Sequence, residues 1–198
     1  ICLAVDYLSA AMVVITAVIH TAVTVYARRD IDDRQVGLGF YSFMQLLAAA
    51  LCGAFLTGDL FNLYVWFEVM LMASFGLLVM GRGPGLLPGA VKYVTINLIS
   101  TLFFLTAIGL IYGLTGTLNM ADLHAKAAGV QNTDLLTAAA MLLMAAFGIK
   151  AALFPLFFWL PAAYPTLPVS VSAFFAGMLT KVGVYAIIRM FTLVFTHD

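Results

Sequence analysis

The chain has 198 residues, of which 64% are hydrophobic and 9% are charged, whereas about a quarter of the residues in a soluble domain are charged. Nine basic and nine acidic residues cancel, so the charge balance gives no indication of the basic surface that nucleic-acid binding needs. Uncharged runs of about 20 residues recur, long enough to cross a bilayer as helices. Composition therefore predicts an all-α, polytopic membrane protein.

Six apolar segments follow one another and predict six membrane-spanning helices within one membrane domain, residues 1–198. They cover residues 1–26, 37–57, 60–80, 89–113, 134–160 and 166–195. Glycine, proline or charge marks each joint, as turns require. The chain begins without Met and ends directly after an apolar segment, so we expect further helices on both sides.

The loops at 27–36 and 81–88 lie on the same side when the helices are threaded alternately. Four arginines lie in these loops: Arg28, Arg29, Arg34 and Arg82. Cytoplasmic loops of membrane proteins carry an excess of Lys and Arg. Both loops are therefore predicted to be cytoplasmic.

One acid, Glu68, lies in the third segment, inside the otherwise uncharged run FNLYVWFEVMLMASF. A charge at the centre of a membrane helix costs on the order of 3 kcal/mol, and such residues usually face a polar interior. The side chain is too short to reach either interface. Glu68 is therefore a candidate for proton transfer, with a structural ion pair between two helices as the alternative.

The fifth segment combines a charge with two prolines. Lys150 directly precedes the run AALFPLFFWLP, which contains Pro155 and Pro161. Proline lacks a backbone donor and frees the carbonyl four residues earlier, so a helix broken beside Lys150 is predicted. Interrupted helices commonly hold the binding site of secondary transporters. A purely structural kink is the alternative.

Two more lysines lie in apolar segments. Lys181 is near the middle of the last segment, whereas Lys92 is near the start of the fourth and has a stem long enough to reach the interface. A buried lysine can exchange its proton near neutral pH, and a nearby carboxylate favours its charged form. Together with Glu68 and Lys150, these lysines predict a proton relay; static pairing is the alternative.

No other chemistry has a comparable signal. His20, His124 and His197 show no metal-ligand spacing, and the chain has no phosphate-binding loop or nucleophile motif. Neither a cofactor nor enzyme activity is therefore expected. Asp59 and Asn62, at the start of the third segment, fit either a helix cap or a mouth that gathers cations.

Three stretches carry a family resemblance. They read GDLFNLYVWFEVMLMASF, KYVTINLISTLFFLTAIGLIYGLTGTLNMADL and FGIKAALFPLFFWLPAAYPTLPVSVSAFFAGMLTKVGVYAIIRMF. Together they cover most of the chain and resemble the D subunit of the Mrp-type multisubunit sodium/proton antiporters. The same superfamily includes the antiporter-like proton-pumping subunits of respiratory complex I. Those relatives typically read WLPDAH where this chain reads WLPAAYP, which favours the Mrp branch.

The resemblance implies a subunit of about fourteen helices with inverted repeats, of which this chain is one part. It implies that Glu68, Lys150 and Lys181 match the family's proton-transfer residues and that Lys92 matches a further lysine. It also implies other membrane subunits as partners, protons and sodium as the ions, the plasma (inner) membrane of a prokaryote, and no cofactor or nucleic acid.

We therefore expect a proton-conducting subunit of a multisubunit sodium/proton antiporter. Glu68 holds Lys150 protonated in this hypothesis, and opening of the pair passes the proton to Lys181, with Pro155 supplying backbone freedom. Two alternatives remain. One is a proton-pumping subunit of a complex I type NADH:quinone oxidoreductase, and the other is a membrane scaffold that transports nothing.

Overall fold

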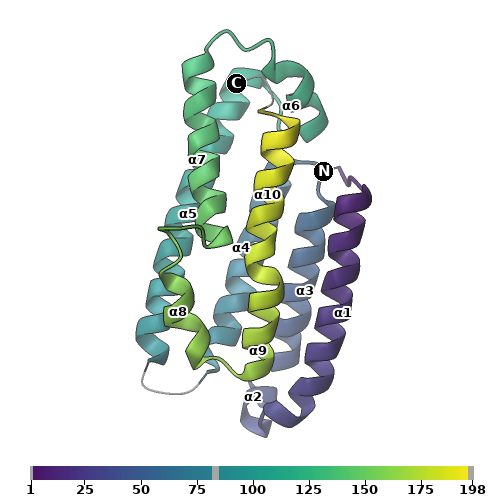
Figure 1. The fold of residues 1–198 in the computed structure, drawn as a ribbon, viewed down its shortest axis with the longest axis vertical. Coiled ribbons are helices and arrows are strands. Elements are labelled where there is room, and N and C mark those ends of the chain that lie inside the picture. Colours follow the sequence, from purple (N-terminus) through teal and green to yellow (C-terminus); the bar gives the residue numbers. More distant parts are fainter. Residues whose placement is uncertain (1, 82–84, 196–198) are drawn as a thin grey trace.

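Long helices run side by side along one axis of the molecule (Figure 1). The computed structural model describes residues 2–81 and 85–195. Five helical stretches there are long and apolar enough to cross a membrane, and a shorter apolar helix accompanies them: Tyr7–Asp30, Leu60–Val79, Leu86–Thr115, Thr133–Ala151 and Val169–Leu193, with Phe40–Leu56 as the shorter one. The all-α, polytopic membrane class predicted from composition is confirmed.

Within these described ranges, ten α-helices follow one another, labelled in chain order in Figure 1. They are α1 (Tyr7–Asp30), α2 (Asp33–Gly37), α3 (Phe40–Leu56), α4 (Leu60–Val79), α5 (Leu86–Thr115), α6 (Met120–Ala127), α7 (Thr133–Ala151), α8 (Trp159–Ala163), α9 (Val169–Phe174) and α10 (Thr180–Leu193). A π-helical turn, Phe175–Leu179, joins α9 to α10. The predicted loop residue Arg82 lies outside the described residues, as does His197.

Side-chain caps define where two of the long helices begin. The Asp6 carboxylate accepts a hydrogen bond from Ser9 N (2.8 Å), and Ser9 Oγ accepts one from Asp6 N (2.8 Å), which starts α1. The Asp59 carboxylate accepts from Asn62 N (2.9 Å) and starts α4. Such caps satisfy donors that a helix leaves unpaired in its first turn. The capping interpretation of Asp59 is therefore confirmed.

Backbone hydrogen bonds join three chain segments at one end of the bundle. Ala4 N donates to Leu56 O (2.8 Å), and Leu60 N donates to Leu118 O (2.9 Å). Consequently the residues before α1, the joint between α3 and α4, and the joint between α5 and α6 all lie at this end, which we call the α6 end (Figure 1).

The opposite end, which we call the α2 end, is held by side chains. Gln35 Nε2 of α2 donates to Met80 O (2.9 Å), directly after α4. The Asp30 carboxylate, at the last residue of α1, accepts from Ser170 N (2.8 Å) and Ser170 Oγ (2.7 Å) at the start of α9. The joint that follows α1 and the joint that follows α4 therefore share one end of the molecule, and their cytoplasmic side stays a prediction.

Candidate proton-transfer site

The helix that carries Lys150 is interrupted one residue after it. Helix α7 ends at Ala151, and α8 begins only at Trp159. Ala152, directly after α7, has a left-handed backbone conformation with φ 55°, which is uncommon for a residue with a side chain. Pro155 lies within the interruption and Pro161 lies inside α8. The role of these prolines in causing the interruption stays a prediction.

Side-chain donors satisfy carbonyls in the last turns of α7. Trp159 Nε1 donates to Ile149 O (3.0 Å), and Ser100 Oγ of α5 donates to Ala146 O (2.8 Å). The last four carbonyls of a helix lack their usual partner within the helix. Ile149 O is one of these and also accepts from Ala152 N (3.1 Å), whereas Ala146 O lies earlier in α7. Trp159 therefore adds a donor at the place where α7 stops, and Ser100 joins α5 to α7 shortly before it; sequence analysis did not single out either residue.

Lys150 is buried, with 6% of its surface exposed. Its Nζ lies 5.6 Å from the centroid of the Phe67 ring of α4. Phe67 in turn packs against Phe104 and Phe147, with ring centroids 5.5 Å and 5.9 Å away. A cation over an aromatic face gains about 0.5–2 kcal/mol, less than the several kcal/mol that burying an ion costs. The aromatic contact alone therefore does not offset the cost of burying a charged amine, so a nearby charge can change the protonation of Lys150.

Glu68 is half-buried on α4, next to Phe67 in the chain. Its Oε1 accepts a hydrogen bond of 2.6 Å from Thr101 Oγ1 of α5. Glu68 lies close enough to Lys150 to act on it electrostatically, but these two described side chains do not form a direct salt bridge. The carboxylate is thus held by a hydroxyl of the neighbouring helix while the amine faces an aromatic ring.

Lys181 lies in the first turn of α10, immediately after the π-helical turn. Its exposed Nζ donates to Ala176 O (2.5 Å) and to Thr180 Oγ1 (3.4 Å). π-Helical turns inside helices frequently occur at functional sites. Lys92 lies on an exposed face of α5 and makes no side-chain hydrogen bond or ion pair with the part of the chain that the structure describes.

Helix α7, which carries Lys150, and helix α10, which carries Lys181, are in close backbone contact. A Cβ added to Gly183 of α10 would lie 2.5 Å from Ala151 N and 2.9 Å from the carbonyl carbon of Lys150. Gly183 therefore allows α10 to lie directly against the last turn of α7. The structure thus brings Lys150 near Glu68 and places the helix of Lys181 against the backbone of Lys150.

Thr101 is the partner of Glu68 that sequence analysis missed. A signal for it exists, because Asn97, Ser100 and Thr101 are polar residues spaced three and four apart in an otherwise apolar helix. This spacing places them on neighbouring positions of one helix surface. Polar residues that recur in this way favour a face directed toward other helices over a face directed toward lipid.

Known proteins match the chain along its length. Residues 57–198 match the family described as "NADH:quinone oxidoreductase/Mrp antiporter, TM". The D subunit of the Na(+)/H(+) antiporter of Bacillus subtilis is 45% identical over 198 residues, which are 100% of this chain and 40% of that protein. The D subunit of a probable K(+)/H(+) antiporter of Rhizobium meliloti is 46% identical over 197 residues, which are 98% of this chain and 36% of that protein.

Two solved structures share the fold. A chain of the Mrp complex from Dietzia sp. superposes with a TM-score of 0.83 at 36% identity, over 96% of this chain and 36% of that chain. A chain of the membrane-bound sulfane sulfur reductase, an archaeal respiratory membrane complex, superposes with a TM-score of 0.89 at 29% identity, over 93% of this chain and 38% of that chain. This chain thus spans less than half the length of these relatives. It belongs to the membrane-subunit family of NADH:quinone oxidoreductases and Mrp antiporters, and within that family it groups with the antiporter D subunits.

Proposed function

We propose that this chain is part of a proton-conducting subunit of a multisubunit cation (sodium)/proton antiporter, working with other membrane subunits. The names of its relatives support this proposal, since they include the D subunit of a Na(+)/H(+) antiporter and a chain of an Mrp complex. Because the chain spans 40% of the B. subtilis relative, the proposal concerns the share of proton transfer carried by Glu68, Lys150 and Lys181. Lys92 is a further member of this relay.

The observation that carries the proposal is a buried amine at an interrupted helix with a carboxylate nearby. Lys150 is 6% exposed, and Glu68 acts on it electrostatically without a direct salt bridge. When Glu68 approaches, its charge favours protonated Lys150; when Thr101 holds Glu68 back, the amine releases its proton more readily. Water and Lys181 then take up that proton. The relay alternates between these two arrangements of Glu68. In this proposal, the α2 end of the molecule faces the cytoplasm.

The test is sodium-driven proton exchange in inverted vesicles that contain the full complex, with assembly checked on a native gel. Lys150→Ala should reduce exchange by about 10²-fold, the lower range for removing a positioned proton-transfer group. Lys150→Arg should also lose exchange, because an arginine keeps its charge but does not release its proton. Lys126→Gln is the matched control, since it removes an exposed lysine of α6.

Each outcome separates the relay from a static role. Exchange retained by Lys150→Ala in an assembled complex would move the proton path to another subunit and leave this chain as a scaffold. Exchange retained by Lys150→Arg, with loss in Lys150→Ala, would show that a fixed charge suffices. For the carboxylate, Glu68→Asp should impair exchange less than Glu68→Ala, because only the first keeps the acid.

A redox-driven pump subunit is the second candidate. The family description includes NADH:quinone oxidoreductase, and the fold is shared with a chain of an archaeal respiratory membrane complex. This candidate predicts that the purified assembly couples electron transfer to proton movement without sodium. Proton exchange that needs a sodium gradient and no electron donor would exclude it.

A further inference from the structure

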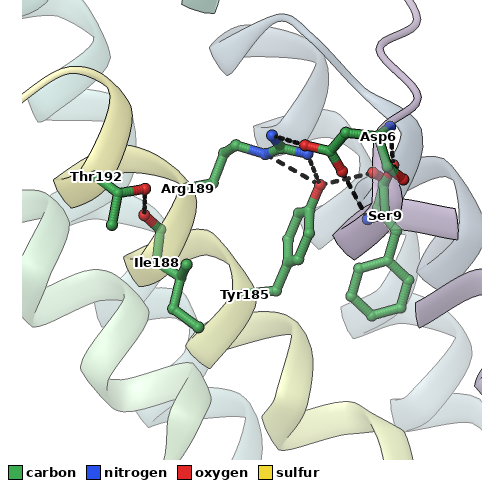
Figure 2. Close-up of polar contacts among 7 residues, drawn as sticks. Asp6, Ser9, Tyr185, Ile188, Arg189 and Thr192 are labelled. Atoms are coloured by element: carbon green, nitrogen blue, oxygen red, sulfur yellow. Dashed lines mark hydrogen bonds and ion pairs between the residues drawn. The ribbon is translucent and has the colours of Figure 1, made fainter. Parts of the chain in front are cut away.

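A cluster of polar side chains joins α1, α3 and α10 at the α6 end. Figure 2 shows the Arg189 guanidinium of α10 directed at the Asp6 carboxylate, with which it forms an ion pair. Arg189 also donates to Tyr185 Oη through Nε (3.2 Å) and Nη2 (2.7 Å). Tyr185 Oη in turn donates to Phe55 O (2.8 Å) near the end of α3. Three helices are therefore fastened at one point.

A cavity of about 430 Å³ lies directly beside this cluster and contains Lys181. Its lining includes Leu8 and Met12 of α1, Ala151 at the end of α7, and Lys181, Val184 and Tyr185 of α10. Apart from Lys181, Thr180 and Tyr185, the side chains that form the cavity are apolar. Leu8 and Val184 are 39% and 42% exposed, so the cavity is open along the face between α1 and α10, and that face offers water no polar partner.

Tyr185 belongs to both the cavity and the cluster. Lys181, Tyr185 and Arg189 follow one another at intervals of four residues, which places them in one row along α10. The row starts at the amine, passes the phenol and ends at the ion pair with Asp6. A route from the α6 end to Lys181 along this row is consequently obstructed by the Asp6, Tyr185 and Arg189 side chains.

We propose that the ion pair of Asp6 and Arg189, braced by Tyr185, closes the Lys181 cavity toward the α6 end only, and that separation of the pair admits water to Lys181 from that end. This inference rests on the proposed function, in which Lys181 exchanges protons. It adds an aqueous access path for Lys181 and two positioning residues, Asp6 and Arg189, which touch neither Glu68 nor Lys150 in the structure.

The ion pair of Asp6 and Arg189 that forms this closure remains ionised at the pH of a cell. Hydrogen bonds from Arg189 and from Ser9 N lower the pKa of Asp6 to about 2. Because this pKa is depressed in the folded chain, the ion pair is fully formed above about pH 4 and is lost as the pH falls toward 2. Protonation of Asp6 therefore does not separate the ion pair at the pH of a cell. In this proposal, movement of α10 relative to α1 separates it and opens the cavity.

Thiol labelling of the cavity tests the closure without using transport as the readout. Val184→Cys places a thiol on the cavity wall, where the residue is 42% exposed. The host is the full chain in its complex, with Cys2 and Cys52 replaced by serine. A membrane-impermeant maleimide is applied separately to right-side-out and inverted vesicles. Ala121→Cys, at an exposed position of α6, identifies which vesicle side presents the α6 end.

Asp6→Asn removes the ion pair but retains the cap of α1, because asparagine caps helices as well as aspartate does. We expect it to raise the labelling rate of Val184→Cys from the α6 side about fivefold, the shift produced by losing one partly exposed ion pair. Arg189→Gln breaks the same pair from the other helix and should give the same rise. Asp122→Asn, which removes an exposed acid of α6, should give none.

Unchanged labelling in Asp6→Asn and Arg189→Gln, or a rise only from the opposite side, would overturn the closure. The native gel shows whether each variant assembles, and Arg189→Gln tests the idea even where Asp6→Asn does not. Failure of the proposed function has a different signature, namely retained exchange in Lys150→Ala, and that result leaves the labelling outcome unaffected.

Discussion

Gly183 offers the sharpest test of how α10 and the interrupted helix are coupled. Replacing it with alanine introduces a Cβ 2.5 Å from Ala151 N, 2.9 Å from Phe147 O and 2.9 Å from the carbonyl carbon of Lys150. All three are backbone atoms of α7, so no side-chain rotation relieves the overlap. Either α10 moves away from α7, or the last turn of α7 distorts around Lys150.

The expected magnitude follows from two opposing effects. Alanine in place of a helical glycine stabilises a helix by about 0.5–1 kcal/mol, whereas an extra methyl in a packed interior costs about 1–3 kcal/mol. We expect the upper end of that cost because backbone atoms are in the way, and hence a net loss of about 2 kcal/mol. Gly109→Ala is the matched control, since no atom lies within 4 Å of its added Cβ.

The assay heats the purified complex in detergent and follows the soluble fraction of this chain, together with proton exchange in vesicles. Gly183→Ala should melt at a lower temperature than the unmodified chain and lose exchange, because Lys150 and the helix of Lys181 are displaced. Gly109→Ala should melt at the same temperature or higher and exchange normally. Equal melting and equal exchange in the two alanine variants would refute the close approach of α10 to α7.

The remaining predictions concern Thr101 and Trp159. Thr101→Val removes the hydroxyl that donates to Glu68 and should lower exchange in vesicles at least about tenfold, because a hydrogen bond to a charged group contributes about 1.5 kcal/mol or more. Thr106→Val, whose hydroxyl bonds only its own helix, is the control, and equal exchange in both variants would contradict the role of Thr101. Trp159→Phe leaves Ile149 O without its indole donor and should cost about 1 kcal/mol of stability, measured by the same melting assay. Trp66→Phe provides the comparison because Trp66 Nε1 has no hydrogen-bond partner among the described residues; equal loss in both would show that the Ile149 bond is unimportant.

The fold class follows from the sequence because membrane helices are encoded by local composition. Runs such as Leu60–Val79 are apolar for long enough to span a bilayer, and this property depends on no distant residue. The cap of α4 by Asp59 follows in the same way, since a cap bonds within three residues. Features that depend only on neighbouring residues in the chain can therefore be predicted from the sequence.

Contacts between helices depend on how each helix is rotated, which composition does not determine. Glu68 and Lys150 stand out in the sequence because charge is rare in this chain. Thr101 and Trp159 do not stand out, because a single hydroxyl or indole in an apolar helix is common. Their roles depend on α5 lying beside α4, and on Trp159 lying beside the last turn of α7.

The stretch from α9 to α10 is held at three points along its length. Ser170 binds Asp30 at its start, Gly183 lies against α7, and Arg189 pairs with Asp6 near its end. The π-helical turn Phe175–Leu179 lies between the first two points, and Lys181 follows it after one residue, Thr180. A π-helical turn interrupts the i→i−4 hydrogen-bond pattern and is a place where helices kink, so a shift of Lys181 relative to Lys150 is most readily absorbed there. Gly183 then determines how far that shift can go, which is why its replacement should affect exchange as well as stability.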